Sequence, residues 1–288
     1  MNKLIRKLFW FILPLPLVWA SFAMLSVPYF DKFHNQKSAD NSIFIWGDSQ
    51  LYRGLDFDLL GEKTGKEIAS AAEHGSGTYD FLMFADKVPE HAKVIISISK
   101  TAQLRRISKD RNMSGISFKA MNELINKGYS FTDILRIVAK NPRPKELFNH
   151  ENKLYQRGES SFTRSDSLLF ESIYNSIPGY AYMKQDIYLT ALNKLLSKDC
   201  IILFLDFPYH SMLKAIEVRS EVKELTDSFS ETILQELEIN EPDTFEIGNI
   251  DSYMHDYTHL DELGARMVTK MVSSKIATLD KNCYLVIQ

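Results

Sequence analysis

The sequence contains few cysteines and no large excess of either charge. Two cysteines, Cys200 and Cys283, could form one disulfide in an exported chain. Two buried thiols are the alternative, because a free cysteine packs as a small hydrophobic residue. The formal net charge is only -3. Binding to nucleic acid calls for a basic face, so this charge balance gives no case for a nucleic-acid partner.

Metal-binding motifs, internal repeats and low-complexity tracts are also missing from the sequence. No pair among the seven histidines has helical ligand spacing with a carboxylate partner, and His255 and His259 come closest. We therefore expect neither a metal ion nor another cofactor. With 45% hydrophobic and 25% charged residues, the 288-residue chain has the composition of a globular protein with one substantial domain.

The N-terminal segment, residues 1–30, differs from the rest of the chain. Three basic residues precede an uncharged apolar run at 8–30, and a run of about 20 apolar residues can cross a bilayer. The basic flank predicts a membrane anchor with the remaining chain on the extracytoplasmic side. A cleaved signal peptide is the alternative, with a small-x-small site at 21–23. A polar tether at 31–41 would then lead to a domain at 42–288.

Short apolar runs alternate with helical patterns along this domain. Apolar strands are expected near residues 43, 67, 94, 200 and 244. Helices are expected at 51–61, 79–85 and 216–239. The alternation predicts an α/β fold, in which helices cover both faces of a parallel sheet to give three α/β/α layers.

A long segment at about 103–196 interrupts this alternation. It has no strong strand signal and carries helical patterns at 118–127, 131–140 and 168–177. An insertion at the carboxyl ends of the strands would lie over the ligand crevice of an α/β sheet. Its polar stretch 152–167 is rich in serine, and we expect it to be the most mobile loop.

The run Ile43–Trp46 is followed by Gly47-Asp48-Ser49, which predicts a buried strand that ends in a turn before a helix. At that position the N–H group of Ser49 could meet a developing oxyanion while its hydroxyl attacks an ester. An ordinary helix cap is the alternative, because Asp and Ser are preferred there. We expect the Asp48 side chain to fix the turn by bonding backbone N–H groups.

An acid and a histidine lie close together near the other end of the chain. Asp256 precedes His259 by three residues, so one loop could present both side chains. The carboxylate would orient the imidazole, and the imidazole would accept a serine proton. Asp261 follows two residues later and is expected at the cap or in the first turn of the last helix.

These two motifs, in this order, resemble those of the SGNH, or GDSL-type, hydrolase superfamily. The resemblance covers about residues 43–276. It implies a serine esterase or O-acyltransferase in which Ser49 is the nucleophile, His259 the base and Asp256 the orienting acid. It also implies that the oxyanion hole is formed by the N–H group of Ser49 and by that of a glycine after the second strand. That glycine is Gly75 or Gly77, which the sequence does not separate.

The sequence departs from the superfamily after the third strand. The usual Gly-x-Asn-Asp block supplies an asparagine to the oxyanion hole, whereas this chain has Ser97-Ile98-Ser99-Lys100-Thr101. Loss of one such donor can cost about 3 kcal/mol of transition-state stabilisation. Either Ser99, Thr101 or Gln103 replaces it, or activity is slow. A catalytically degenerate, membrane-tethered binding protein is therefore the alternative function.

The segment Pro208-Tyr209-His210 resembles one found in some membrane-linked members of the superfamily. It follows an apolar strand, which would place His210 on the rim of the site. We assign it at most a contact with substrate, and a surface histidine is the alternative. Outward-facing, tethered members often modify cell-envelope polysaccharides. The resemblance therefore implies an acyl-ester or glycan substrate.

Overall fold

The computed structural model describes residues 38–74, 76–104, 125–126, 152–157, 162, 179–217 and 222–288. The apolar run at 8–30 lies outside these residues, as do the helical patterns at 131–140 and 168–177 and nearly all of the pattern at 118–127. Within the described residues, no helix has the length and apolar character needed to span a membrane.

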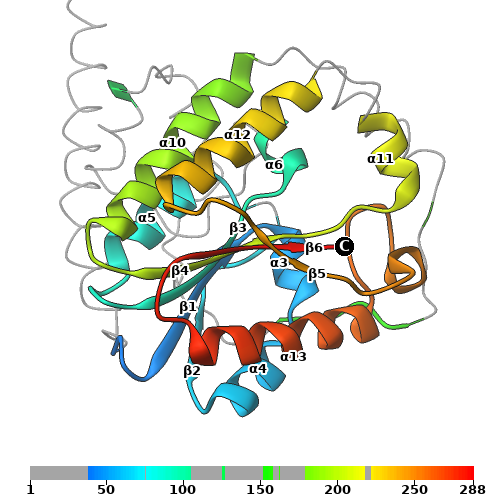
Figure 1. The fold of residues 1–288 in the computed structure, drawn as a ribbon, viewed down its shortest axis with the longest axis horizontal. Coiled ribbons are helices and arrows are strands. Elements are labelled where there is room, and N and C mark those ends of the chain that lie inside the picture. The colour runs from blue at the N-terminus through cyan, green and yellow to red at the C-terminus, as the bar shows by residue number, and fades with distance from the viewer. Residues whose placement is uncertain are drawn as a thin grey trace, which may run out of the picture.

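The described residues form one six-stranded sheet in which every strand pairing is parallel (Figure 1). Its strands are β1 (Ser42–Gly47), β2 (Glu67–Ser70), β3 (Lys93–Ser97), β4 (Ile201–Asp206), β5 (Asp243–Phe245) and β6 (Cys283–Ile287). The strand order is β2-β1-β3-β4-β6-β5. Because all strands run the same way, the segments that follow them emerge at one edge of the sheet.

Helices cover both faces of this sheet. The described helices are α3 (Ser49–Gly54), α4 (Phe57–Thr64), α5 (Thr78–Lys87), α6 (Lys100–Leu104), α10 (Gly179–Leu196), α11 (Ser211–Glu217), α12 (Val222–Glu236), the 3-10 helix η2 (Ile250–Tyr253) and α13 (Glu262–Thr278). Helices α5, α10 and α12 lie on one face, and α4 and α13 lie on the other (Figure 1). The predicted α/β class and its three-layer arrangement are therefore confirmed.

Strand β1 shows why the central strands are apolar throughout. Its side chains alternate between two cores, so Phe44 and Trp46 pack toward α5 and α10, whereas Ile43 and Ile45 pack toward α3, α4 and α13. The Trp46 ring stacks on Phe81 of α5 with ring centroids 4.1 Å apart. A parallel strand with helices on both faces has no solvent side, which explains the unbroken apolar run.

The structure differs from the sequence-based expectations at several elements. The strand near 244 is a short edge strand and not the last one, because Cys283–Ile287 forms β6 between β4 and β5. The helix expected at 51–61 is two helices, since Asp56 caps a new helix by accepting a hydrogen bond from the Leu59 N–H (3.0 Å). The helix expected at 216–239 is likewise described as α11 and α12.

Helix α10 changes the extent expected for the insertion. It covers residues 179–196, which the sequence assigned to the insertion, yet it packs against α5 and α12 over the sheet. Its buried residues, including Ile187 and Tyr188, belong to the same core as Trp46. Residues 179–196 therefore belong to the layer of helices on this face of the sheet.

Both cysteines are buried, unbonded thiols. The Cys200 Sγ lies 3.5 Å from the Pro89 carbonyl oxygen, and the Cys283 Sγ lies 3.4 Å from Asp243 Oδ2. Burial raises the pKa of both thiols, and for Cys283 burial together with the hydrogen bond to Asp243 raises the pKa to about 11. Of the two alternatives, the structure has the buried thiols and not the disulfide.

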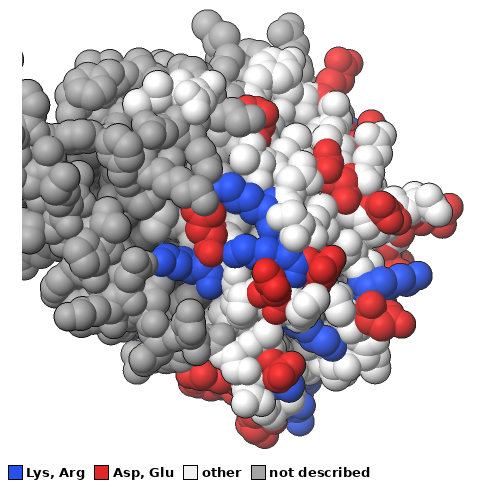
Figure 2. Space-filling model, turned by 90° about the vertical axis from the view of Figure 1, so that its left-hand side faces the viewer, with Lys and Arg blue, Asp and Glu red and all other residues white. Residues whose placement is uncertain are grey.

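The described surface carries charges of both signs close together. On the face shown in Figure 2, Lys and Arg side chains lie next to Asp and Glu side chains, without an extended patch of one sign among the described residues. An ion pair of 3.1 Å between Lys194 and Asp86 links α10 to α5. Pairing of this kind is expected for a chain whose net charge is close to zero.

Candidate active site

The turn between β1 and α3, residues 47–51, is named here the nucleophile corner. Its tightness depends on Gly47, where a Cβ atom would lie 2.7 Å from the Leu51 Cβ and 3.1 Å from the Ser97 carbonyl oxygen. Asp48 is the N-cap of α3 and accepts a hydrogen bond from the Gln50 N–H (3.0 Å). The predicted role of Asp48 is confirmed, and Ser49 becomes the first residue of the helix.

The segment between β5 and α13 forms a second tight structure, residues 254–260, named here the acid–base loop. Met254 and Leu260 form an antiparallel bridge, and the His255 N–H donates to the His259 carbonyl oxygen (2.8 Å). Asp261 then caps α13 by accepting from the Gly264 N–H (2.8 Å), as predicted. The loop is thereby closed at its base, with Asp256 near its tip.

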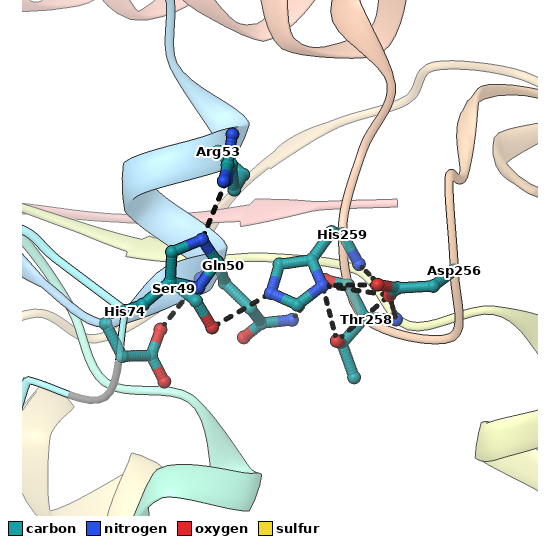
Figure 3. A network of polar contacts seen from close by, with 8 residues as sticks. Ser49, Gln50, Arg53, His74, Asp256, Thr258 and His259 are labelled. Carbon is teal, nitrogen blue, oxygen red and sulfur yellow. Dashed lines mark hydrogen bonds and ion pairs between the residues drawn. The ribbon is translucent and has the colours of Figure 1, made fainter. Parts of the chain in front are cut away.

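The two regions bring Ser49, His259 and Asp256 together. His259 Nε2 lies 2.8 Å from Ser49 Oγ, and His259 Nδ1 lies 2.7 and 2.9 Å from the two carboxylate oxygens of Asp256. In Figure 3, Ser49 and His259 point toward each other, with Asp256 on the opposite side of the imidazole. These distances lie within the range for proton transfer between a nucleophile and its base.

Asp256 is held as a carboxylate. Burial on its own would raise the pKa of Asp256, but the hydrogen bond and charge of His259 and the N–H groups of Thr258 (2.8 Å) and His259 (2.9 Å) outweigh it and lower that pKa to about 2. An ionised Asp256 favours the imidazole tautomer with its proton on Nδ1. That tautomer leaves Nε2 free to accept the Ser49 proton.

Gln50 connects the two regions directly. Its side chain is 2% exposed, and its Nε2 donates to the Thr258 carbonyl oxygen (3.0 Å). Gln50 follows the nucleophile in α3, and Thr258 precedes His259, so this bond fixes the distance between the two motifs. Sequence reasoning missed Gln50, because nothing in its local pattern indicates a partner 208 residues away.

Two further aromatic rings, those of Tyr155 and His74, lie close to the His259 ring. The Tyr155 ring stacks on His255 with centroids 3.8 Å apart and approaches the His259 ring edge-on at 5.6 Å. The His74 ring lies 6.1 Å from the His259 ring. Tyr155 is held in place through its backbone, whose carbonyl accepts from the Glu262 N–H (2.7 Å). Sequence reasoning missed these aromatic neighbours.

The start of the polar stretch 152–167 is anchored to the core of the domain. Asn152 Nδ2 donates to the carbonyl oxygens of Tyr52 (2.8 Å) and Leu55, and its Oδ1 accepts from the Phe57 N–H (3.4 Å). These bonds tie residues 152–157 to α3 and α4. The mobility expected for this stretch stays a prediction, because only residues 152–157 and 162 of it are described.

The donors expected for the oxyanion hole are placed as follows. The Gly77 N–H donates to Asp80 Oδ2 (3.2 Å), so it is already used, and Gly75 lies outside the described residues. The Ser99 hydroxyl donates to Asp48 Oδ2 and accepts from the Ala102 N–H (3.0 Å). A hydroxyl has one proton to donate, so in this arrangement Ser99 does not replace the missing asparagine.

Three further residues were expected at the site, namely Gln103, Thr101 and His210. The Gln103 Oε1 accepts from Gln185 Nε2 (3.0 Å) of α10. The side chain of Thr101 is outside the described set. The backbone N–H of His210 donates to the Tyr257 carbonyl oxygen (3.0 Å), so His210 adjoins the acid–base loop, while its Nδ1 accepts from the Met212 N–H (3.2 Å).

A metal centre is not part of this arrangement as far as the structure describes it. Among the described residues, no group of three or more His, Cys, Asp or Glu side chains is placed to hold a metal ion.

No protein-family model matches the chain, and no curated protein matches it.

Proposed function

We propose that this chain performs serine-dependent acyl-ester chemistry, as an esterase or an O-acyltransferase. The observation that carries the proposal is the chain of short contacts from Ser49 Oγ through His259 to Asp256. A nucleophile, a base and an acid that orients the base are the parts that acyl transfer needs.

The steps follow from these contacts. His259 Nε2 takes the proton of Ser49 as Oγ attacks the ester carbonyl carbon, and Asp256 stabilises the resulting imidazolium. The negative charge on the carbonyl oxygen is met by the Ser49 N–H at the start of α3. When the intermediate collapses, the bond to the alcohol breaks, the alcohol takes the proton from His259, and the acyl group stays on Ser49. Water or a sugar hydroxyl then releases the acyl group by the same steps in reverse.

A membrane-tethered binding protein is the second candidate, and a specific observation favours it. Two expected oxyanion donors, the Gly77 N–H and the Ser99 hydroxyl, already donate to carboxylates. If neither is released when a substrate binds, the site would bind an ester without rapid turnover.

More specifically, we propose that this chain is an SGNH-type hydrolase. A serine two residues after the first strand and an Asp-x-x-His loop before the helix α13 support this family. The basic flank before the apolar run at 8–30 supports an anchor with the domain on the extracytoplasmic side. By analogy with tethered members of that superfamily, the proposed substrate is an O-acylated polysaccharide of the cell envelope.

Labelling of the full-length protein in detergent with a fluorophosphonate probe tests the proposal. We expect the probe to react covalently with Ser49, and Ser49→Ala and His259→Ala to abolish the labelling. Ser252→Ala and His91→Asn are matched controls at exposed positions, and both should keep it. Absence of labelling, together with no Ser49-dependent hydrolysis of p-nitrophenyl acetate, would refute the enzyme and favour the binding protein.

A further inference from the structure

Arg53 lies on the same face of α3 as the nucleophile. It follows Ser49 by four residues within Ser49–Gly54, and residues with this spacing are neighbours on a helix, with about 5–6 Å between their Cβ atoms. The Arg53 side chain is partly buried. Its guanidinium is therefore within reach of a group attached to the ester that Ser49 would attack.

The Arg53 guanidinium is held in place by groups that carry no negative charge. Its Nε donates to His74 Nε2 (2.9 Å), and its Nη1 donates to the Lys153 carbonyl oxygen. Its Cζ lies 4.4 Å from the centroid of the Tyr155 ring and 5.3 Å from that of Tyr52. Stacking on aromatic faces fixes the plane of a guanidinium without neutralising its charge.

The same partners place this cation beside the catalytic histidine. The Tyr155 and His74 rings, which both contact Arg53, also approach the His259 ring at 5.6 and 6.1 Å between centroids. Arg53, His74 and His259 are seen together in Figure 3. The guanidinium thus belongs to the wall of the site and not to a distant surface.

The charge of Arg53 has no carboxylate partner among the residues that the structure describes. Arg266 shows the usual arrangement, with ion pairs to Asp56 (3.1 Å) and Glu262 (2.9 Å). The hydrogen-bond partners of Arg53 there are an imidazole nitrogen and a backbone carbonyl, which carry no negative charge and use two of the five N–H groups of a guanidinium. The three that remain can bind a carboxylate or phosphate through two parallel hydrogen bonds.

We propose that Arg53 binds an anionic group of the substrate, a carboxylate or a phosphate, next to the ester that Ser49 attacks. This inference rests on the proposed acyl-ester function and specifies its substrate as an anionic one. A uronic acid in a polysaccharide and a phosphodiester-linked glycan both carry this chemistry. Arg53 acts here in substrate selection, and the acid–base chemistry remains with His259.

Hydrolysis of the acetyl group from two aryl acetates, one with an anionic and one with a neutral para substituent, provides the kinetic test on full-length protein. The two acetates are p-acetoxybenzoate, which carries a carboxylate, and its neutral methyl ester. We expect Arg53→Gln to raise KM for the anionic ester about tenfold or more, to leave its kcat within about twofold, and to change kcat/KM for the neutral ester by less than about twofold. Arg53→Lys should retain part of the selectivity, because it keeps the charge without the planar fork. The matched control Arg266→Gln should affect neither ester.

Calorimetry adds a binding measurement that requires no turnover. Methyl glucuronoside and dimethyl phosphate, a simple phosphodiester, are titrated into the Ser49→Ala protein, with methyl glucoside as the neutral counterpart. Tighter binding of the first anion would identify a uronic acid as the source of the charge, and tighter binding of the second a phosphodiester. In either case Arg53→Gln should weaken that binding about tenfold or more, and Arg266→Gln should not.

The outcomes separate the two proposals. Equal losses on both esters after Arg53→Gln would mean that Arg53 only supports the fold of the site, and this would overturn the inference. Absence of Arg53-dependent binding of either anion would overturn it as well. Arg53-dependent binding by a protein that hydrolyses neither ester would instead refute the enzyme and retain the anion site.

Discussion

The nucleophile corner and the acid–base loop meet at the site, yet different forces hold them in place. The nucleophile corner depends on close packing, since Gly47 lets α3 turn directly off β1 and Leu51 fills the space beside it. The acid–base loop depends on polar contacts, since one carboxylate, Asp256, accepts from two backbone N–H groups and from the His259 ring. We therefore expect a change in packing to disturb the nucleophile corner, and acid or the loss of a hydrogen bond to disturb the acid–base loop.

In the acid–base loop, one residue both supports the fold of the loop and takes part in the proposed chemistry. Asp256 closes the tip of the acid–base loop and orients His259 at the same time. In the nucleophile corner the two tasks are divided, because Gly47 and Asp48 shape the turn and Ser49 carries the hydroxyl. Substitutions in the corner should thus separate structure from chemistry more cleanly than substitutions in the loop.

The largest expected effect is that of Asp256→Asn on the acid–base loop. Asparagine can keep an acceptor for the backbone N–H groups, but it neither fixes the tautomer nor stabilises an imidazolium. We expect kcat on p-nitrophenyl acetate to fall by about 10³- to 10⁴-fold, with the far-UV circular dichroism spectrum preserved. An Asp256→Asn protein that keeps more than a tenth of the activity would mean that another acid serves His259.

The nucleophile corner should respond most strongly to Gly47→Ala. The added methyl group would meet Leu51 and the Ser97 carbonyl, so α3 has to move away from β1. We expect a loss of about 1–3 kcal/mol in the free energy of unfolding and a fall of about 10- to 100-fold in kcat/KM as Ser49 shifts from His259. Urea unfolding and steady-state kinetics measure the two effects. Unchanged values for both would show that packing does not set the position of Ser49.

Acid should weaken the loop through Asp256. Its pKa is about 2 in the folded protein, below the ordinary value of 3.8, so the charged form stabilises the fold. That contribution, about 2 kcal/mol, is complete above pH ~4 and is lost as the pH falls toward ~2. Urea unfolding of the wild type and of Asp256→Asn between about pH 5 and 2.5 measures it. The wild type should lose more stability than the variant, and parallel curves would contradict the assignment.

The link between the two regions should be broken by Gln50→Leu. The change leaves the Thr258 carbonyl oxygen without its Gln50 donor. We expect a fall of roughly tenfold in kcat/KM as the loop shifts relative to Ser49 and a loss of about 1 kcal/mol in stability. Gln185→Leu is a matched control, because it removes another buried glutamine that bonds α6 and α12. Equal losses of activity in both variants would show that Gln50 has no special place in the site.

The smallest effect is expected for Asp261→Ala, just beyond the loop. Loss of this N-cap should lower the free energy of unfolding by about 1 kcal/mol and change kcat by less than about twofold. Asp56→Ala, at the N-cap of α4, is the matched control and should give a similar loss of stability. A large loss of activity for Asp261→Ala alone would mean that the acid–base loop extends beyond residue 260.

The sequence predicted those parts of the site that depend on local patterns. A strand followed by Gly-Asp-Ser, an acid three residues before a histidine, and a cap before the last helix each leave a signal within ten residues. Asp48 and Asp261 therefore have the roles expected of them, and Ser49, Asp256 and His259 meet. The alternation of strands and helices predicted the layers in the same way.

Contacts between distant segments left no such signal. Tyr155 lies in a polar stretch that indicates a mobile loop, and only tertiary structure shows it stacked on His255. In the sequence Arg53 is an ordinary residue of an expected helix, and only the tertiary structure shows its contacts with His74 and Tyr155. Strand β6 was missed because five residues at the end of a chain carry little periodic information, although their place between β4 and β5 is decisive.

The pairing of Ser49 with His259 spans 210 residues of chain, which has a consequence during biosynthesis. Chains emerge from the ribosome N-terminal part first, and domains fold as units. Ser49 would leave the ribosome well before its base is made, so for most of translation it would be an unactivated hydroxyl. Under the proposed function, a chain that stalls or is cut before residue 259 would carry Ser49 without the histidine that activates it. Covalent labelling of Ser49 would therefore report that the last part of the domain has been made and has folded.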